Sequence, residues 1–536
     1  MALSSPGHDA VGTFARRGQP LTALSFAVFA ALVACLSWHQ TPADPAALVA
    51  KHPNRVRINR AVGGSIALFG PVIVHDSIAG LQHSEDSSSR AAVPLAAVKS
   101  VEVEGFSPGR TALLFAAGAT AILLIESQKS GSSGGGGSIS SGGGGSDCKG
   151  CGGSCPYVYA WDGAGWRLAS GTFGGAIART FQRTVVDPLD SAVPQGATLR
   201  LKVTNELDET DYLDELAVLA VDHEPGLAVA ADPSGGLHTL RALIAPMRAV
   251  DFRGADALTR VRDLDGWGWE SSFGGRDTAR AADLRDGLEL TFLRPHGAPQ
   301  AHLVLDARNT LWAVHLLDSF VASHGAATST WYDSLNTQPA LALALATRLA
   351  AEGFLALSVR TRSGWTPAGL FPLVGPEHAA RQVLDVDLTQ VDGDTVRLRL
   401  ESAATLWLID RVALDFTADR PLVAHELPLV SARSSTGTDV AALLVTSDGR
   451  DYVMESGDSA VLTFRVTPPE PRMARSFLLR SAGWYRTHVP SVDPPDIAMQ
   501  NAVMKEPLGI SRMTVVRLNE ALARLGPPAG SGRPRP

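Results

Sequence analysis

Leu199-Arg200-Leu201-Lys202-Val203 and Val396-Arg397-Leu398-Arg399-Leu400-Glu401 decide the fold class of this chain, because apolar and charged residues alternate along both stretches. Neighbouring side chains of a β-strand point to opposite faces, so each stretch is predicted to be a strand with one face in a core and the other in water. Similar runs recur from residue 157 to residue 479, whereas helical patterns occur only at residues 311–323, 339–351 and 511–525. We therefore predict a mainly β chain whose large body is a sandwich or jelly roll with a few helices.

The composition indicates a long chain built from short elements. Of 536 residues, 45% are hydrophobic and 19% are charged, while 52 glycines and 33 prolines provide many turns. A chain of this length can bury more than one core, so two or three domains are expected. The net charge of -7 is small and no tract rich in Lys and Arg is present, which argues against a nucleic-acid partner.

Residues 1–34 form a segment like an export leader. Arg16-Arg17 precede an apolar stretch that ends in Leu32-Val33-Ala34, which is the order of a secretory signal. The following residue, Cys35, makes the junction resemble the lipobox of bacterial lipoproteins, in which the signal is cut before a cysteine that carries lipid. We therefore expect Cys35 to be the lipidated first residue of the mature protein. The alternative is an uncleaved signal anchor.

Three segments separate this leader from the body. Residues 35–108 contain strand-like runs separated by glycine, proline and polar turns, which predicts a small antiparallel β module. Residues 109–127 include the uncharged run 111–125, which predicts a second hydrophobic helix that either spans a bilayer or lies buried or at its surface. Residues 128–147 are rich in Gly and Ser and are predicted to be a flexible linker.

The body is expected to contain two β-rich subdomains. We place them at residues 148–352 and 353–490, with the boundary near Glu352, where a helical insertion ends. Residues 491–536 are predicted to hold a C-terminal helix and a disordered tail rich in Gly, Pro and Arg.

Three of the four cysteines, Cys148, Cys151 and Cys155, stand close together at the start of the body. A structural zinc site needs four ligands, and no further Cys or His pair follows at a usual interval. In an exported protein we favour a local disulfide with one thiol left over, and no metal site is assigned. Metal binding and a fully reduced set are the alternatives.

Three acidic segments could bind a cation, and two histidines stand in apolar surroundings. Asp263-Leu264-Asp265-Gly266 and Asp392-Gly393-Asp394 are predicted to be hairpin turns, because neither supplies the ligand series of a calcium loop. Residues 205–215 are dense in carboxylates and are expected to be a solvated strand connection, with cation binding as the alternative. His223 and His315 lie within apolar patterns and are expected to be hydrogen-bonded core residues.

No motif in the sequence names a reaction. A Gly-x-Ser-x-Gly elbow occurs nowhere outside the linker, and neither a P-loop nor a Gly-x-Gly-x-x-Gly fingerprint is present, so no catalytic or cofactor-binding residue is assigned. Exposed tryptophans on a β-sheet can stack on sugars or anchor a partner. We single out Trp267 and Trp269 as a candidate binding face.

The body resembles a group of uncharacterised bacterial envelope proteins that open a domain with Cys155-Pro156-Tyr157-Val158-Tyr159-Ala160-Trp161-Asp162-Gly163 or a similar phrase. Further matches are Asn205-Glu206-Leu207-Asp208-Glu209-Thr210, Asp214-Glu215-Leu216, Val221-Asp222-His223, Asp306-Ala307-Arg308-Asn309-Thr310-Leu311-Trp312 and Leu478-Leu479-Arg480-Ser481-Ala482-Gly483-Trp484-Tyr485. Some members of that group are joined to tetratricopeptide repeats, which implies an interaction role. No activity is assigned to the group, so the resemblance implies no catalytic residue.

These features together predict a noncatalytic binding protein tethered to the bacterial cell or outer membrane. Its body is expected to face the periplasm or the exterior and to bind a protein or a glycan, with no cofactor. If the leader and residues 109–127 both spanned the membrane, the body would instead share the side of the N-terminus. Two alternative functions remain: an envelope enzyme that acts on glycans through carboxylates on separate strands, and a structural protein of envelope assembly.

Overall fold

The computed structural model describes residues 36–40, 55–60, 65–81, 90–106, 156–273, 275–489 and 494–525. The chain is mainly β and contains several antiparallel sheets, as the sequence predicts. It divides into two compact units, Met1–Leu114 and Phe115–Pro536. The leader, the hydrophobic segment 109–127 and the linker lie outside the described residues. In the part of the chain that is described, no helix combines the length and hydrophobicity that crossing a membrane requires.

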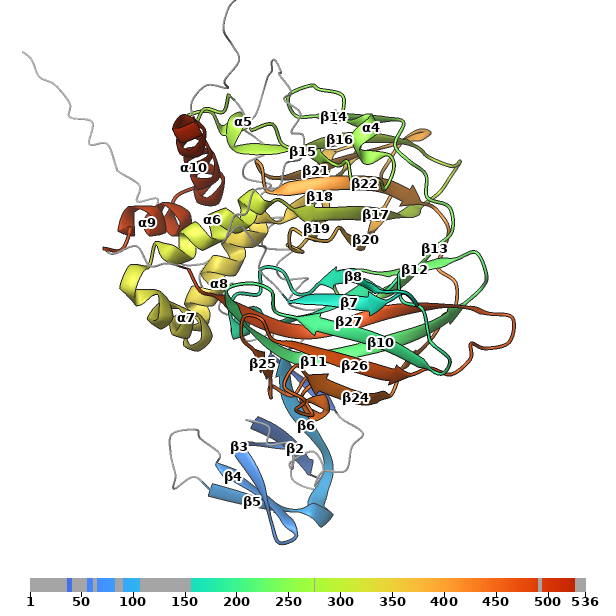
Figure 1. The fold of residues 1–536 in the computed structure, drawn as a ribbon, viewed down its shortest axis with the longest axis vertical. Coiled ribbons are helices and arrows are strands. Elements are labelled where there is room, and N and C mark those ends of the chain that lie inside the picture. The colour runs from blue at the N-terminus through green and yellow to red at the C-terminus, as the bar shows by residue number, and fades with distance from the viewer. Residues whose placement is uncertain are drawn as a thin grey trace, which may run out of the picture. The chain divides into compact units, whose positions relative to one another are not determined.

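Unit 1 is a six-stranded antiparallel sheet with the strand order β1-β6-β2-β3-β4-β5 (Figure 1). Its strands are β1 (Leu36–Gln40), β2 (Arg55–Arg60), β3 (Ser65–Val74), β4 (Ser77–Leu81), β5 (Arg90–Pro94) and β6 (Val98–Phe106). Val56 and Ile58 alternate along β2 and are fully buried against Leu68 and Ile78. This unit confirms the small antiparallel β module.

Unit 2 begins with a sandwich of two sheets, which we call sandwich 1. Sheet 1 has the order β24-β26-β10-β7-β8, and sheet 2 has the order β23-β11-β27-β9, with β25 paired to β11. The strands are β7 (Tyr157–Trp161), β8 (Trp166–Gly171), β9 (Arg183–Pro188), β10 (Thr198–Thr204), β11 (Glu209–His223), β23 (Val423–Glu426), β24 (Leu429–Ser434), β25 (Tyr452–Met454), β26 (Ser459–Arg465) and β27 (Ala474–Thr487). The alternation at residues 199–203 is confirmed in β10, where Leu199, Leu201 and Val203 are buried.

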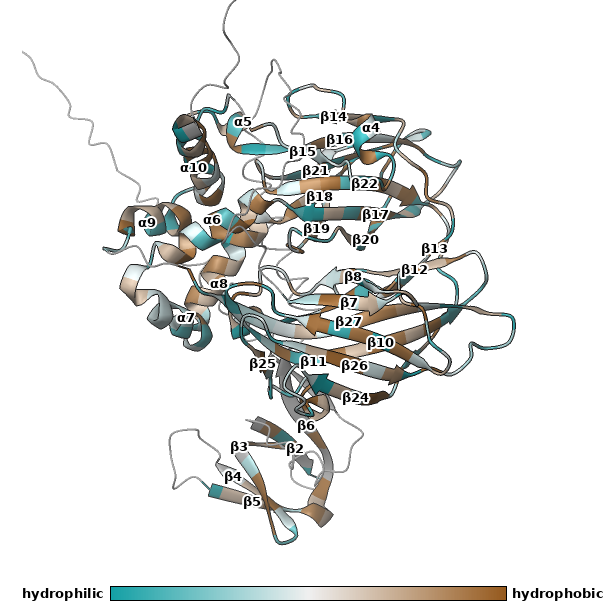
Figure 2. Cartoon of the chain, in the orientation of Figure 1, coloured by the Kyte–Doolittle hydropathy of each residue, from teal (hydrophilic) through white to brown (hydrophobic). Residues whose placement is uncertain are grey.

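A second sandwich, sandwich 2, has its own core. Sheet 3 has the order β14-β16-β21-β18-β19, and sheet 4 has the order β15-β22-β17-β20. The strands are β14 (Arg248–Asp251), β15 (Trp269–Glu270), β16 (Arg285–Leu293), β17 (Gln300–Asn309), β18 (Leu355–Thr361), β19 (Gly364–Phe371), β20 (Ala380–Asp387), β21 (Thr395–Ala403) and β22 (Trp407–Asp415). Val396, Leu398 and Leu400 of β21 are fully buried, which confirms the second alternating stretch. Figure 2 shows hydrophobic residues interleaved with polar ones along the strands of both sandwiches.

Sandwich 2 is inserted into sandwich 1. All strands of sandwich 2 lie in sequence between β11 and β23, and a hairpin of β12 (Ala228–Ala231) and β13 (Leu237–Leu240) precedes them. The subdomain boundary expected near Glu352 therefore runs through sandwich 2, because β16 precedes it and pairs with β21, which follows it. Strand pairing between distant segments, rather than chain order, sets the real division.

Helices pack at one side of both sandwiches (Figure 1). They are α6 (Leu311–Ala322), α7 (Thr328–Thr337), α8 (Pro339–Arg348), α9 (Ile497–Lys505) and α10 (Gly509–Leu525), and two single turns, α4 (Leu258–Val261) and α5 (Ala281–Leu284), lie within sandwich 2. The three helices predicted from the sequence are α6, α8 and α10, whereas α7 and α9 were not predicted. Phe320 of α6 joins the core of sandwich 1, and Leu316 joins that of sandwich 2.

Candidate functional site

The residues that the sequence singled out fall into two groups. Cys35, Cys148, Cys151 and Cys155 lie outside the described residues, so lipidation and the disulfide stay predictions. Trp267 is 66% exposed, whereas Trp269 is 7% exposed and belongs to the core of sandwich 2. Because β15 pairs with β22, the side chain of Trp269 is held in that core. The two tryptophans therefore do not share one binding face.

The two Asp-Gly segments are turns but not hairpins. Gly266 and Gly393 adopt the left-handed region, with φ of 83° and 76°, which glycine tolerates best. Gly266 lies between α4 and β15, while Gly393 lies between β20 of sheet 4 and β21 of sheet 3. These turns connect elements that do not pair with each other, so the hairpin assignment is wrong.

The acidic segment 205–215 is a solvated connection only at Glu206 and Asp208, which are exposed between β10 and β11, whereas the prediction is wrong for the residues from Glu209 onward. Asn205, Glu209, Asp211 and Asp214 are at most 2% exposed, because this segment enters the central strand β11. The Asn205 side chain donates to the backbone of Glu209 and Met454, which closes the entry to the strand. Burial raises the pKa of Asp211 well above its usual range. Burial thus disfavours the charged form of this carboxyl group.

The two histidines judged from the sequence differ in their surroundings. His223 is buried and hydrogen-bonded through both ring nitrogens, to the Glu224 carbonyl at 2.9 Å and to Ser476 Oγ at 2.9 Å, which confirms a core histidine. His315 is exposed on α6, where its ring lies 5.0 Å from that of Trp312. The prediction of a core residue is wrong for His315, because the apolar pattern around it belongs to other faces of the helix.

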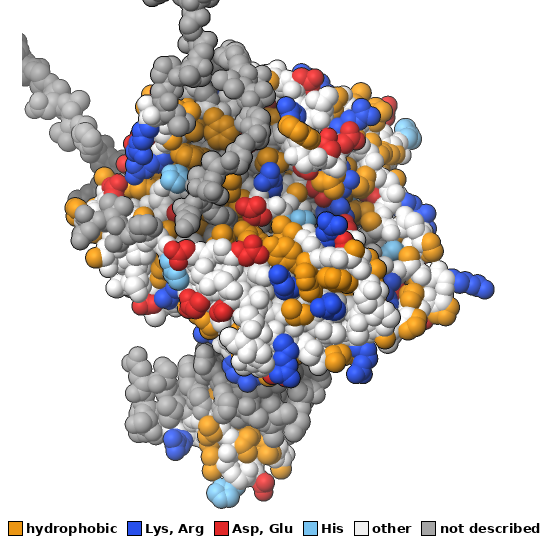
Figure 3. All heavy atoms as spheres, in the orientation of Figure 1, with side chains coloured by type: hydrophobic (Ala, Val, Ile, Leu, Met, Phe, Trp, Pro, Cys, Tyr) orange, Lys and Arg blue, Asp and Glu red, His pale blue; other side chains and the backbone are white. Residues whose placement is uncertain are grey.

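One exposed aromatic face lies on sheet 1 at the β7–β8 hairpin, and we call it the Trp161 face. Trp161 and Trp166 are opposite each other across the hairpin, with ring centroids 5.3 Å apart in an edge-to-face arrangement. The Arg200 guanidinium lies 5.3 Å and 5.2 Å from the two rings. Figure 3 shows hydrophobic side chains gathered over β7 and β8 with basic ones among them. The aromatic rings here mainly contact each other and stabilise the hairpin.

The polar side of the Trp161 face is internally paired. Tyr159 donates to Glu206 at 2.8 Å, and Lys202 lies 5.3 Å from the Tyr159 ring. Burial and the Glu206 carboxylate raise the pKa of Tyr159 to about 12, so its hydroxyl stays protonated. Glu206 is therefore already hydrogen-bonded, while Lys202, like Arg200, lies over an aromatic ring.

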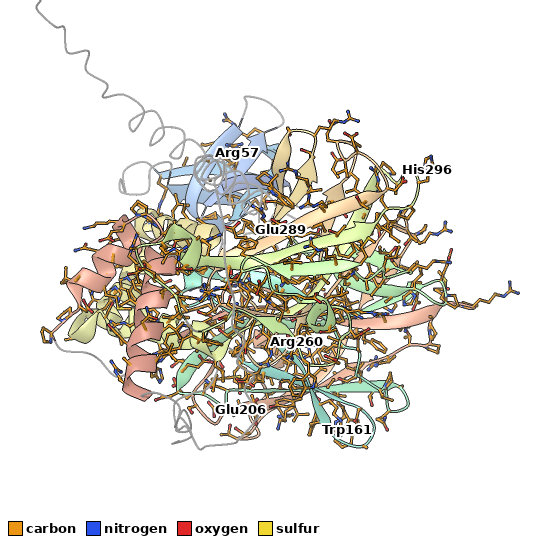
Figure 4. The ribbon with its side chains drawn as sticks, turned by 90° about the horizontal axis from the view of Figure 1, so that it is seen from above. Arg57, Trp161, Glu206, Arg260, Glu289 and His296 are labelled. Atoms are coloured by element: carbon orange, nitrogen blue, oxygen red, sulfur yellow. The ribbon has the colours of Figure 1, made fainter. Side chains whose placement is uncertain are left out.

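A second exposed face lies on sheet 3, and we call its residues Arg360, Trp365, Arg397 and Arg399 the Trp365 face. Strand register brings them together, because Arg360 is opposite Trp365 and Ser358 is opposite Arg399. Alternation along β21 then places Arg397 and Arg399 on the same surface. Glu289 of sheet 3 pairs with these arginines, and Figure 4 labels it together with Trp161 of sheet 1. The two labelled residues lie well apart, so the Trp365 face and the Trp161 face are separate surfaces of unit 2.

Three guanidinium groups surround the Trp365 indole. Those of Arg399, Arg397 and Arg360 lie 4.4, 5.9 and 5.8 Å from the ring centroid. Glu289 accepts from Arg399 at 2.5 Å and from Arg397 at 3.3 Å. Within the described residues, the Arg360 guanidinium has no carboxylate partner. The face therefore combines excess positive charge with a half-exposed aromatic ring.

One cluster of metal-ligand type was missed by the sequence analysis. His238, His302 and Asp385 come from three different strands, and one ligand atom from each lies within 4.8 Å of the others. The hydrogen bond between His238 and Asp232 raises the pKa of His238 to about 9, because it outweighs the opposite effect of burial. No local spacing in the sequence signals this cluster, because the three residues are separated by more than sixty positions at each step.

An apolar cavity of about 80 Å³ lies where the helices meet the two sandwiches. Its lining includes Leu316, Phe320, Leu345 and Leu406 and contains no carboxylate. It is therefore not the two-carboxylate cleft that a glycan-cleaving enzyme would need.

Comparisons of the chain with protein-family models, with curated proteins and with solved structures find no match. The resemblance to bacterial envelope proteins thus stays a prediction, and the functional argument rests on the geometry of the two sandwiches.

Proposed function

We propose that this protein is a noncatalytic binding protein of the bacterial cell envelope, and that the Trp365 face recognises an anionic glycan. The observation that supports this most is the set of three guanidinium groups around one half-exposed indole. An aromatic ring stacks on the apolar face of a sugar ring, while arginine pairs with carboxylate or phosphate through two parallel hydrogen bonds. A sugar unit that carries an acid group would satisfy both at once.

Charge distinguishes this face from the Trp161 face. On the Trp365 face Glu289 is shared by Arg397 and Arg399, and Arg360 remains for an incoming anion. On the Trp161 face Asp162 already pairs with Arg167 at 2.7 Å, and Glu206 with Tyr159. Three guanidinium groups thus lie beside one carboxylate on the Trp365 face, whereas two carboxylates lie beside Arg167, Arg200 and Lys202 on the Trp161 face. An anionic ligand therefore gains more at the Trp365 face.

Binding is best tested by titrating the full-length protein with a polyuronic acid and with a neutral glucan of similar length. We expect the acid polymer alone to bind, and to bind more weakly as salt rises, because salt screens exposed charges. Trp365→Ala and Arg360→Gln should each weaken binding roughly tenfold, equivalent to about 1.4 kcal/mol. The matched controls, Trp161→Ala and Arg200→Gln, should leave it unchanged. Equal binding of the neutral glucan, or loss of binding in the controls, would contradict the proposal.

The membrane tether is a separate part of the proposal. It rests on Leu32-Val33-Ala34-Cys35 and on the Gly/Ser-rich residues 128–147, which would let the body search for its ligand. Palmitate labelling of the wild type and of Cys35→Ala, combined with protease accessibility on intact cells, tests it. We expect palmitate label in the wild type and none in Cys35→Ala. We also expect added protease to cleave the body, at the latest once the outer membrane has been permeabilised. An unlabelled, protected chain would contradict the tether.

A further inference from the structure

His238, His302 and Asp385 meet where the chain passes between the two sandwiches. His238 lies on β13, in the hairpin that precedes sandwich 2, while His302 and Asp385 lie on neighbouring strands β17 and β20 of sheet 4. Asp419 lies on the returning segment between β22 and β23. Apolar residues of the same two parts pack beside the cluster: Ala230, Leu240, Val304 and Val383. A bond formed here would join the hairpin to sheet 4.

The three side chains are spaced for one shared ion. Asp385 Oδ1 lies 2.7 Å from His302 Nδ1 and 3.9 Å from His238 Nδ1, and the two imidazole rings are 4.9 Å apart. Nitrogen and oxygen ligands bind Zn²⁺ at about 2.0–2.2 Å, so neighbouring ligand atoms of a tetrahedral site lie roughly 3.4 Å apart. Small side-chain rotations would bring the observed distances to that value.

Two further carboxylates hold the histidines in place. Asp232 Oδ1 accepts the backbone N–H of Ser234 at 2.7 Å and of Gly236 at 2.8 Å, which leaves Oδ2 at 3.5 Å from His238 Nε2. That nitrogen is buried and, among the residues that the structure describes, has no other hydrogen-bond partner. A carboxylate behind one imidazole nitrogen, with the other nitrogen facing the ion, is the usual second layer of a metal site.

Asp419 offers a fourth ligand. Its Oδ2 lies 3.0 Å from His238 Nδ1, and its Oδ1 lies 3.7 Å from His302 Nε2. The backbone N–H of Thr239 donates to Oδ1 at 2.7 Å and so fixes the carboxylate. The two histidines are buried, with side chains 10% and 4% exposed, whereas the Asp385 side chain is 70% exposed. An ion can therefore enter from solvent on the Asp385 side.

We propose that this cluster binds one divalent transition-metal ion of the Zn²⁺ class, with His238, His302 and Asp385 as ligands and Asp419 as the fourth. Two imidazoles and two carboxylates suit such an ion better than Ca²⁺ or Mg²⁺, which prefer sites made of oxygen alone. Three carboxylates, those of Asp232, Asp385 and Asp419, lie beside the two histidines, so a dication would meet an excess of negative charge there. Any proton held on a ligating nitrogen leaves to solvent when the ion binds. The ion would link the β12–β13 hairpin to sheet 4.

The test uses the full-length protein in which Cys35, Cys148, Cys151 and Cys155 are all replaced by Ser, so that thiolates cannot bind the probe. Zn²⁺ is titrated by calorimetry, and bound Zn²⁺ is measured after dialysis. We expect one ion per chain and a higher melting temperature in its presence. His302→Asn and Asp385→Asn should each weaken Zn²⁺ binding by tenfold or more.

Asp385→Asn is the decisive variant, because its exposed side chain can change without disturbing the core. Asp387→Asn is the matched control on the same strand, and its carboxylate accepts from the Thr389 backbone N–H at 2.8 Å rather than facing the histidines. The control should bind Zn²⁺ as the wild type does. Absence of stoichiometric binding in the wild type would overturn the proposal, and so would binding that survives both ligand variants. If His302→Asn is less stable and the wild type binds no Zn²⁺, the cluster links the β12–β13 hairpin to sheet 4 through ion pairs alone, which overturns the proposal.

Discussion

Sandwich 1 and sandwich 2 are both built from two facing antiparallel sheets, yet they bury carboxyl groups differently. In sandwich 1, Asp187 accepts a hydrogen bond from Ser170, and burial raises its pKa to about 6. In sandwich 2, Asp286 meets Arg276 at 2.5 Å, and Asp306 meets Arg381 at 3.0 Å and Arg411 at 2.7 Å. Asp187 is thus buried with a hydroxyl as its partner, whereas Asp286 and Asp306 are buried against guanidinium groups.

For these residues, a change in pH is expected to alter stability through Asp187 of sandwich 1. Removal of a partner is expected to alter stability through Asp286 and Asp306 of sandwich 2. A protonated carboxyl group costs little free energy in a core, and the cost rises when it ionises at higher pH. A buried ion pair becomes destabilising when one partner is removed, because the other charge is left unpaired. Sandwich 1 also contains ion pairs, among them Asp222 with Arg475 at 2.6 Å and Glu215 with Arg480 at 2.6 Å, and Arg475 lowers the pKa of Asp222. The contrast therefore concerns Asp187 and Asp211, not every acid of sandwich 1.

The largest effect is expected from Arg276→Met in sandwich 2. The Arg276 side chain is 0% exposed, so its removal leaves the Asp286 carboxylate buried without its cation. We expect the free energy of unfolding to fall by about 3–5 kcal/mol, measured by urea denaturation. Adding Asp286→Leu should restore most of that loss, since the unpaired charge is then gone. If the double variant stays as unstable as the single one, packing rather than charge explains the loss.

Next in size is Asp187→Asn in sandwich 1, which should stabilise the protein at neutral pH. The folded state holds the Asp187 proton up to about pH 6, whereas the unfolded chain releases it near 4. Stability of the wild type therefore falls as pH rises from about 4 to 6, by roughly 3 kcal/mol in all. Asparagine carries no such charge and should remove this loss.

Urea denaturation at pH 4 and at pH 7 measures the effect of Asp187→Asn. The two proteins should be nearly equal at the lower pH and differ at the higher one. Asp263→Asn, at an exposed position, is the control and should show no pH-dependent difference. A variant that is less stable than the wild type at pH 7 would argue that Asp187 is ionised and satisfied in the fold.

The smallest effect is expected from Arg381→Gln, because Asp306 keeps its second partner, Arg411. Arg381 also pairs with the exposed Asp190 at 3.0 Å, but the buried hydrogen bond to Asp306 should account for most of a loss on the order of 2 kcal/mol. Arg362→Gln, which removes an exposed pair with Asp392, is the control and should leave stability almost unchanged. Equal losses in the two variants, seen in the same denaturation experiment, would mean that burial adds nothing to the pair.

Local patterns predicted individual elements well. Residues 199–203 and 396–401 lie within β10 and β21, and the helical patterns at 311–323 and 339–351 correspond to α6 and α8. In each of these elements, apolar residues recur at the spacing of a strand or a helix within the segment itself, so no other part of the chain is needed to recognise it. Helix α7 was missed, because only Tyr332 and Leu335 are buried in a stretch rich in Ser and Thr.

The candidate sites were much less accessible to sequence reasoning. The Trp365 face depends on the register of β18 with β19 and β21, which no single stretch records. His238 and Asp385 are 147 positions apart in the numbering and meet only because the β12–β13 hairpin packs on β20. Trp269 seemed equivalent to Trp267 in the sequence, but pairing of β15 with β22 buried it.

The sequence by itself determined that the described chain is mainly β, because alternation with period two is a property of each strand alone. Only the tertiary structure decided that sandwich 2 interrupts sandwich 1, which acids stay protonated, and which residues share a face. Those outcomes depend on pairing and burial between segments far apart in the chain, and the free energies involved exist only once the segments have met.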